Sequence, residues 1–315
     1  MQCAEDAAAR WEAAIRWALA VTIPFWLAAF AWRFADERLY ADSGYYLMRA
    51  LNDGAFRIEH GRWVLALPQA PPLLAAKLGL PLAWVIRIHS LGNALWLAAG
   101  MLAAWRALRA PDAAVALAAL QVTGLAHGLF CPVFELYYGA GLLVLFIAAW
   151  RARHLGAKRR TALLLALFIA AISSHPMALA LMAWALLMER AWRERALFVA
   201  LCAAGAAWLT YHALTISAYE KDHLAALRRA GEPGVALGLL SPAFMGQWLA
   251  HAWRHYPDAL LVCATALGLL AANRRWREAM LLLALLAVVQ SAVAIKLPAF
   301  VHDRYREQMD FPMAA

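Results

Sequence analysis

The side chains that could do chemistry are concentrated in one short segment, residues 42–80, with the sequence DSGYYLMRALNDGAFRIEHGRWVLALPQAPPLLAAKLGL. Asp42 begins this segment, and a carboxylate can accept a proton from a hydroxyl or an amine as a general base. Arg62 lies in the same segment, and its guanidinium can bind a phosphate through two hydrogen bonds. Simpler roles stay open for both residues. Asp42 is also a good N-cap for a following helix, and Arg62 can be a solvated loop residue.

Other polar residues stand inside apolar runs or at their edges. Arg87 and His89 lie within the run that starts at Pro81. A charge at that depth in a bilayer costs roughly 3 kcal/mol, so we expect Arg87 to bind an anion inside the protein or to extend toward the membrane surface. Glu135 begins another apolar run and follows His127 closely. A metal site normally has three or four ligands, so we predict no metal here, with a divalent metal as the alternative.

These residues must be positioned by a chain whose expected solvent is lipid. Hydrophobic residues make up 65% of the 315, charged residues 16%, and the mean hydropathy is +0.59. Because a helix needs about 20 apolar residues to cross a bilayer, we predict an all-α polytopic transmembrane bundle of about nine spans. The predicted spans are 16–34, 81–105, 112–130, 132–150, 161–172, 177–188, 196–216, 257–272 and 279–297. The fifth and sixth are short, and we expect them to form a hairpin that turns at 173–176.

The distribution of Lys and Arg predicts the orientation. Basic residues crowd the short connections RALRAP, RARHLGAKRR, RAWRER and RRWRE, and short basic loops face the cytoplasm. The N-terminus is therefore predicted to be cytoplasmic and the long segments 35–80 and 217–256 to be outside. The net charge of +9 follows from this rule and does not indicate nucleic-acid binding.

We predict a single transmembrane domain, 1–315. Its parts are a cytoplasmic N-terminus with the first span (1–35), an outer loop with interfacial helices (36–80), spans two to seven (81–216), a second outer loop (217–256), and the last spans with an outer C-terminus (257–315). Residues 41–52 have apolar side chains at helical spacing, and the second outer loop ends in another such stretch. The four cysteines are scattered without a paired motif, which indicates neither a disulfide framework nor a zinc site.

A span followed by an outer acid and two interfacial helices resembles the GT-C superfamily of membrane glycosyltransferases. The segment Asp42-Ser-Gly-Tyr-Tyr, the Asn-Asp-Gly-x-Phe stretch and the Glu-His-x-Arg stretch carry the resemblance over about 60 residues. The segment is similar to uncharacterised bacterial members, and the resemblance implies either a short member or a piece of a longer one. The resemblance implies transfer of a sugar from a polyprenyl-phosphate donor to an acceptor outside the membrane, here the bacterial inner (plasma) membrane.

The resemblance also implies roles for individual residues. Asp42 is the expected catalytic base, and Asp36, in the Asp-Glu pair nearer the membrane, is the second candidate. His175 resembles the His of a Ser-His-Pro turn, and Arg304 with Tyr305 resembles an Arg-Tyr pair near the ends of such domains. The complete set of expected substrate-binding residues is Glu59, His60, Arg62, Arg87, Glu135, His175, Arg304 and Tyr305.

A second interpretation is a protein without this chemistry, either an assembly or scaffold subunit with a membrane-protein partner or a small transporter. Transporters place charges near the bilayer midplane and often contain duplicated halves. We find no duplication, and the acids between spans fall at the predicted cytoplasmic ends. The residues favour the enzyme over the transporter. They identify neither the sugar, the carrier nor the acceptor.

Overall fold

The computed structural model describes residues 2–40, 42–123, 131–133, 135–218, 220–222, 225, 242–255 and 257–296. Every element in these ranges is helical, and they contain no strand, in agreement with the all-α prediction. The principal helices are α1 (Gln2–Arg33), α2 (Asp42–Asp53), α3 (Ala66–Lys77), α4 (Leu82–Leu102), α5 (Pro111–Thr123), α7 (Glu135–Arg151), α8 (Ala157–Ile172), α9 (Pro176–Met188), α10 (Arg195–Thr215), α13 (Pro242–His255), α14 (Pro257–Ala272) and α15 (Trp276–Lys296).

Shorter helical turns join some of these elements. They are η1 (Glu37–Leu39), η2 (Trp63–Leu65), the π-helical η3 (Ala103–Ala107) that continues α4, and η4 (Ala191–Arg193). Proline is the first residue of α5, α9, α13 and α14. This is the position where the missing N–H of proline costs no helical hydrogen bond.

Among the described residues, three helices are long and apolar enough to cross a membrane: Ala14–Arg33, Leu82–Ala107 and Arg195–Thr215. Shorter apolar helices cover Tyr137–Arg151, Ala178–Met188 and Leu260–Ala272. Nine spans are therefore not confirmed, because several of the predicted spans coincide with helices shorter than a bilayer requires. The predicted hairpin is confirmed, since α8 ends at Ile172 and α9 begins at Pro176.

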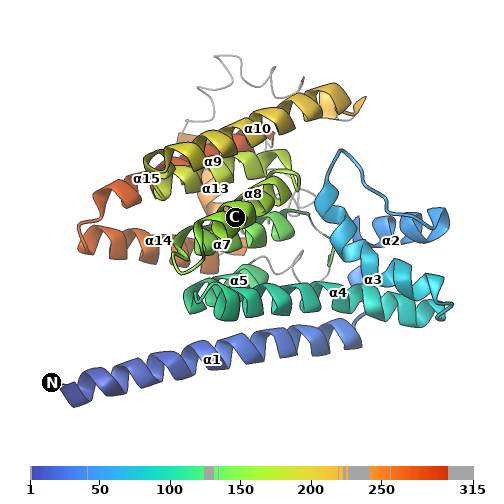
Figure 1. Ribbon diagram of the computed structural model, residues 1–315, viewed down its shortest axis with the longest axis horizontal. Coiled ribbons are helices and arrows are strands. Elements are labelled where there is room, and N and C mark those ends of the chain that lie inside the picture. Colours follow the sequence, from blue (N-terminus) through green and yellow to red (C-terminus); the bar gives the residue numbers. More distant parts are fainter. Residues whose placement is uncertain are drawn as a thin grey trace.

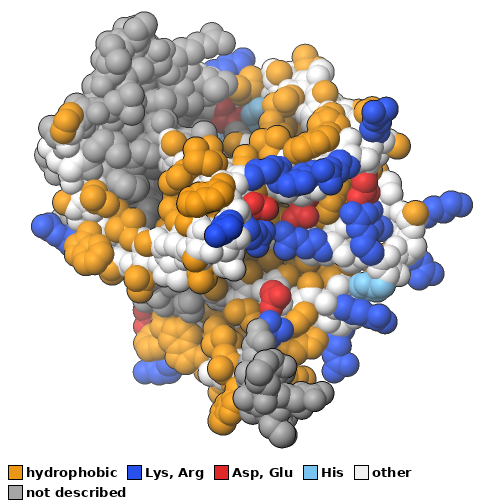
Figure 2. All heavy atoms as spheres, turned by 90° about the vertical axis from the view of Figure 1, so that its left-hand side faces the viewer, with side chains coloured by type: hydrophobic (Ala, Val, Ile, Leu, Met, Phe, Trp, Pro, Cys, Tyr) orange, Lys and Arg blue, Asp and Glu red, His pale blue; other side chains and the backbone are white. Residues whose placement is uncertain are grey.

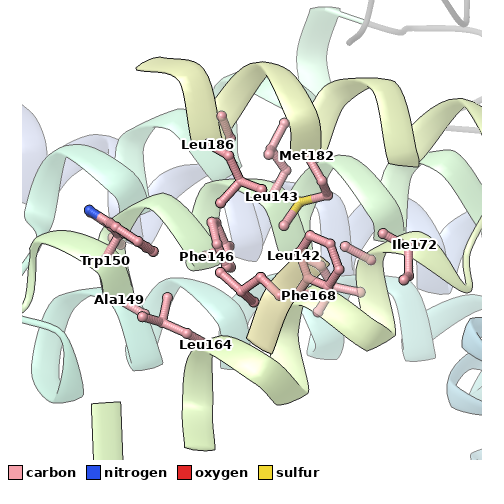
Figure 3. Close-up of a cluster of buried hydrophobic side chains, with 14 of the residues drawn as sticks. Leu142, Leu143, Phe146, Ala149, Trp150, Leu164, Phe168, Ile172, Met182 and Leu186 are labelled. Atoms are coloured by element: carbon pink, nitrogen blue, oxygen red, sulfur yellow. The ribbon is translucent and has the colours of Figure 1, made fainter. Parts of the chain in front are cut away.

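The two largest apolar clusters among the described residues pack the helices of the bundle together. The larger centres on α7, α8 and α9, where Phe146, Leu164 and Met182 are fully buried (Figure 3). The second joins α1 to α4 and α5 through Leu27, Met101 and neighbouring side chains. In Figure 1 α1 runs along the lower edge of the bundle beside α4.

Helices α2 and α3 lie together at the right-hand end of Figure 1, beside the start of α4. Leu47 of α2, Ala75 of α3 and Val85 of α4 form a small apolar cluster that fixes the three helices to one another. The sequence prediction of two helices in residues 36–80 is confirmed. Pro71 and Pro72 lie inside α3, which is 12 residues long.

Candidate functional site

The candidate site begins at the first turn of α2, which carries Asp42 at its exposed start. The helix is oriented by Tyr46 and Leu47, which are buried. Gly44 allows η1 to approach closely, because a Cβ at this position would lie 2.5 Å from the backbone oxygen of Leu39. The sequence Asp-Ser-Gly therefore places an exposed carboxylate next to the close contact between α2 and η1.

A buried polar contact lies beside Asp42. The hydroxyl of Ser43 is 2.8 Å from Nε2 of His89, and both residues are buried. Within the described part of the chain, Nδ1 of His89 is buried and has no hydrogen-bond partner. This contact ties the start of α2 to α4.

Arg38 of η1 provides a second link to α4. Its Nη2 donates to the backbone oxygen of Ser90 at 3.4 Å and to Oδ1 of Asn93 at 3.3 Å. The side chain is fully buried, and burial lowers the pKa of Arg38 to about 10. Arg38 therefore helps to position the outer loop on α4.

The centre of the site is an ion pair between Arg62 and Glu135. Nη1 of Arg62 binds Oε1 of Glu135, and the two side chains are only 15% and 4% exposed. The pair joins the turn before η2 to the first residue of α7, where the helix dipole favours a negative charge. Nε of Arg62 and Oε2 of Glu135 are buried without a hydrogen-bond partner among the described residues. The pair therefore retains hydrogen-bonding capacity that these residues do not use.

The charges of Asp42 and Glu135 both affect the pKa values of Tyr46 and Cys131. Burial raises the pKa of Tyr46, and the charges of Glu135, Glu59 and Asp42 raise it further, whereas Arg62 lowers it. Burial raises the pKa of the Cys131 thiol to about 12, and the Asp42 carboxylate is the next cause. Three carboxylates and one guanidinium therefore act on the same small region.

Glu59 and His60 lie at the edge of this region. Oε1 of Glu59 accepts hydrogen bonds from the Tyr45 hydroxyl at 2.6 Å and from Nε of Arg57 at 2.9 Å. Burial raises the pKa of Glu59, but these two hydrogen bonds outweigh it and the net effect is a lowered pKa. Nδ1 of His60 is 2.9 Å from the hydroxyl of Ser217. His60 therefore connects the outer loop to the chain after α10.

The structure separates some predicted residues from the cluster. Arg87 lies over the rings of Trp32 and Trp84, at 5.3 Å and 5.8 Å from their centroids. Asp36 is exposed before η1 and makes no side-chain hydrogen bond that caps it. The structure brings neither residue to the Arg62–Glu135 pair, so their predicted roles stay predictions.

His175 lies in the α8–α9 turn, which packs on α7 one helical turn beyond Glu135. An ideal Cβ on Gly139 would be 2.3 Å from the Ser174 hydroxyl, so glycine permits this contact. Arg304 and Tyr305 lie outside the described residues, as does His127.

Ser43, Tyr46 and Arg38 were not predicted as site residues. A buried polar side chain within an apolar run is a usable signal for His89, but Arg38 resembles any exposed loop arginine.

No group of three or more His, Cys, Asp or Glu side chains that could hold a metal ion is found in the part of the chain that the structure describes. An apolar groove of about 200 Å³ lies between α3, α4 and α7 and is lined by Leu67, Pro71, Trp96 and Tyr138, among others. Tyr138 follows Glu135 by about one turn of α7.

The fold and the site define an all-helical protein with membrane-length helices and a buried acid–arginine cluster beside an exposed aspartate. Comparison of the chain with models of protein families, with characterised proteins and with solved structures finds no match.

Proposed function

We propose that this protein is an integral membrane glycosyltransferase of the GT-C type. It would move a sugar from a polyprenyl-phosphate donor to an acceptor on the extracytoplasmic face, with its N-terminus in the cytoplasm of a bacterial cell. The observation that carries the proposal is the buried Arg62–Glu135 pair beside the exposed Asp42. A carboxylate that can accept a proton and a cation that can stabilise a departing phosphate both assist sugar transfer from a phosphate carrier.

Asp42 would take the proton from the acceptor hydroxyl as its oxygen attacks the anomeric carbon of the sugar. The bond between that carbon and the phosphate oxygen breaks, and the bonding electrons leave with the polyprenyl phosphate. Arg62 would stabilise the charge that develops on the departing phosphate. Glu135 holds the guanidinium in place until the donor binds, because a buried arginine needs a counter-charge.

The apolar groove between α3 and α4 supports the proposal from a separate direction. A polyprenyl chain needs an apolar path beside the site that holds its phosphate. Leu67 of α3 and Leu95 of α4 line the groove, and Tyr138, one turn beyond Glu135 on α7, borders it. A lipid tail in this groove would leave its phosphate near Arg62.

A non-catalytic assembly subunit is the second candidate, because Arg62 is already paired. A buried ion pair that joins a loop to a helix can serve structure alone. Asp42→Asn distinguishes the two candidates. In both cases the Arg62–Glu135 pair should stay intact, but only the enzyme has a transfer activity that the variant abolishes.

The test reconstitutes the full chain in liposomes with a panel of labelled undecaprenyl-phosphate sugars and bacterial membrane extract as acceptor. The measured product is undecaprenyl phosphate, which every sugar in the panel releases. We expect release with the wild type and loss with Asp42→Asn. The same low release from wild type and variant across the panel would favour the non-catalytic subunit.

A further inference from the structure

Opposite the α2–α3 end, the molecule carries a basic end, made by the α4–α5, α7–α8, α9–α10 and α14–α15 connections. Figure 2 faces this end and shows Lys and Arg side chains over its centre and right, with a few acidic side chains between them. Nε2 of His154 lies 3.0 Å from the backbone oxygen of Ala107 and ties two of these connections together. Charges that are distant in sequence therefore share one face.

The acids at the basic end are already neutralised. Asp112 pairs with Arg16 at 3.0 Å, Glu189 pairs with Arg151, and Glu278 pairs with Arg275 at 3.5 Å. Glu194 pairs with both Arg153 and the buried Arg160. Among the described side chains, the remaining cations of this end have no ion pair with a carboxylate; they are Arg106, Arg109, Lys158, Arg159, Arg190, Arg193, Arg195, Arg274 and Arg277.

Several of these cations lie where either the helix dipole or the local backbone conformation disfavours them. Lys158 and Arg159 are in the first turn of α8, where the helix dipole disfavours positive charge. Arg109, Arg190 and Arg274 have φ angles of 54°, 53° and 55°. This left-handed region favours glycine over any side chain. The backbone conformation therefore does not explain why arginine, rather than glycine, occupies these three positions.

Exposed aromatic and apolar side chains lie beside the cations. Trp192 is 44% exposed and Trp276 is 62% exposed, and Leu187, at the end of α9, is 48% exposed. Binding of a soluble acidic partner would use the positive charge of this surface and would not account for the exposed apolar side chains. Cations next to exposed tryptophan and leucine match the boundary between lipid head groups and acyl chains.

We propose that the basic end binds the head groups of anionic phospholipids, with the phosphates contacting the unpaired cations of the α4–α5, α7–α8, α9–α10 and α14–α15 connections and the acyl chains lying against Trp192 and Leu187. This inference is independent of the proposed sugar transfer. It requires only that the membrane-length helices bring the basic end to a lipid surface.

The test compares binding of dioleoyl phosphatidylglycerol and dioleoyl phosphatidylcholine to the full chain in neutral detergent, measured by native mass spectrometry. We expect phosphatidylglycerol to bind at least about 10-fold more tightly. Each cation near a lipid surface contributes about a fivefold change in affinity. The triple variant Arg109→Gly, Arg190→Gly, Arg274→Gly should therefore weaken phosphatidylglycerol binding about 100-fold. Its thermal midpoint without phosphatidylglycerol should not fall, since glycine relieves the left-handed backbone.

The matched control removes three exposed cations near the other end, Arg33→Gln, Arg49→Gln and Lys77→Gln, and should change binding less than twofold. A second variant, Lys158→Gln with Arg159→Gln, covers the case in which the glycine variant does not fold, and should weaken binding about 25-fold. Equal affinity for the two lipids would overturn the proposal. So would unchanged binding in the folded variants, or an equal loss in the control.

Discussion

The hydroxyl of Ser43 lies 2.8 Å from Nε2 of His89, and this buried contact fixes the helix that begins with Asp42 to the second apolar segment of the chain. Ser43 comes directly after the proposed base, so any shift of this contact moves the carboxylate. The position of Asp42 is therefore set by a histidine 47 residues further along the chain.

Removal of this contact should destabilise the outer loop. Ser43→Ala leaves Nε2 of His89 buried without its partner, which costs about 1–3 kcal/mol of the free energy of unfolding. Thermal unfolding in detergent measures the loss. Thr210→Ala, which removes an exposed hydroxyl bonded within its own helix, is the control and should change stability by less than about 0.5 kcal/mol.

Asp42→Asn should reduce sugar transfer about 100-fold or more, the loss expected for a general base. The thermal midpoint should stay near that of the wild type, because Asp42 is exposed. Release of undecaprenyl phosphate is the measurement. Asp36→Asn is the companion variant and should transfer normally. If Asp36→Asn is inactive and Asp42→Asn is active, the base is the earlier acid.

The Arg62–Glu135 pair should be sensitive to loss of one partner alone. Arg62→Ala leaves a buried carboxylate without its counter-charge and should destabilise the protein by about 3–5 kcal/mol. Arg62→Met with Glu135→Leu removes both charges and should recover most of this loss. If the double variant is stable and still transfers sugar, Arg62 does not bind the donor phosphate. If the double variant is stable but inactive, the ion pair is not needed for stability and Arg62 or Glu135 is needed for transfer.

Gly44→Ala should destabilise the α2 end of the molecule. The new methyl group would lie 2.5 Å from the backbone oxygen of Leu39, so η1 or α2 must shift, at a cost of about 1–3 kcal/mol. Gly156→Ala is the matched control, because nothing lies within 4 Å of a Cβ there and its φ is −58°. Equal midpoints for the two variants would contradict the close packing of η1 on α2.

The orientation of the chain is open to a direct test. A cysteine placed at Asp53, which is exposed at the end of α2, should react with a membrane-impermeant maleimide in intact cells. A cysteine at Lys158, exposed in the first turn of α8, should react only after the cells are broken. Both variants are made in a background without native cysteines. Labelling of Lys158→Cys alone in intact cells would reverse the predicted topology.

Local sequence patterns were sufficient to predict several structural elements. The helical spacing of apolar residues in 41–52 predicts α2, and the Ser-Ser-His-Pro turn predicts the break between α8 and α9. Helix periodicity and proline act over a few residues, so these features are readable without knowledge of the fold. The predicted number of spans was not confirmed, because hydropathy measures composition and does not show where an apolar helix ends.

Two candidate residues, Arg62 and Glu135, were recognised from their types, but their pairing across 73 positions appears only in the folded chain. Arg87 was likewise recognised from its charge, and only the folded chain shows that it lies over the rings of Trp32 and Trp84. Residue type and local spacing determined which groups could do chemistry. Tertiary packing decided which of them meet, because burial and the partners of a charge depend on helices that are distant in sequence.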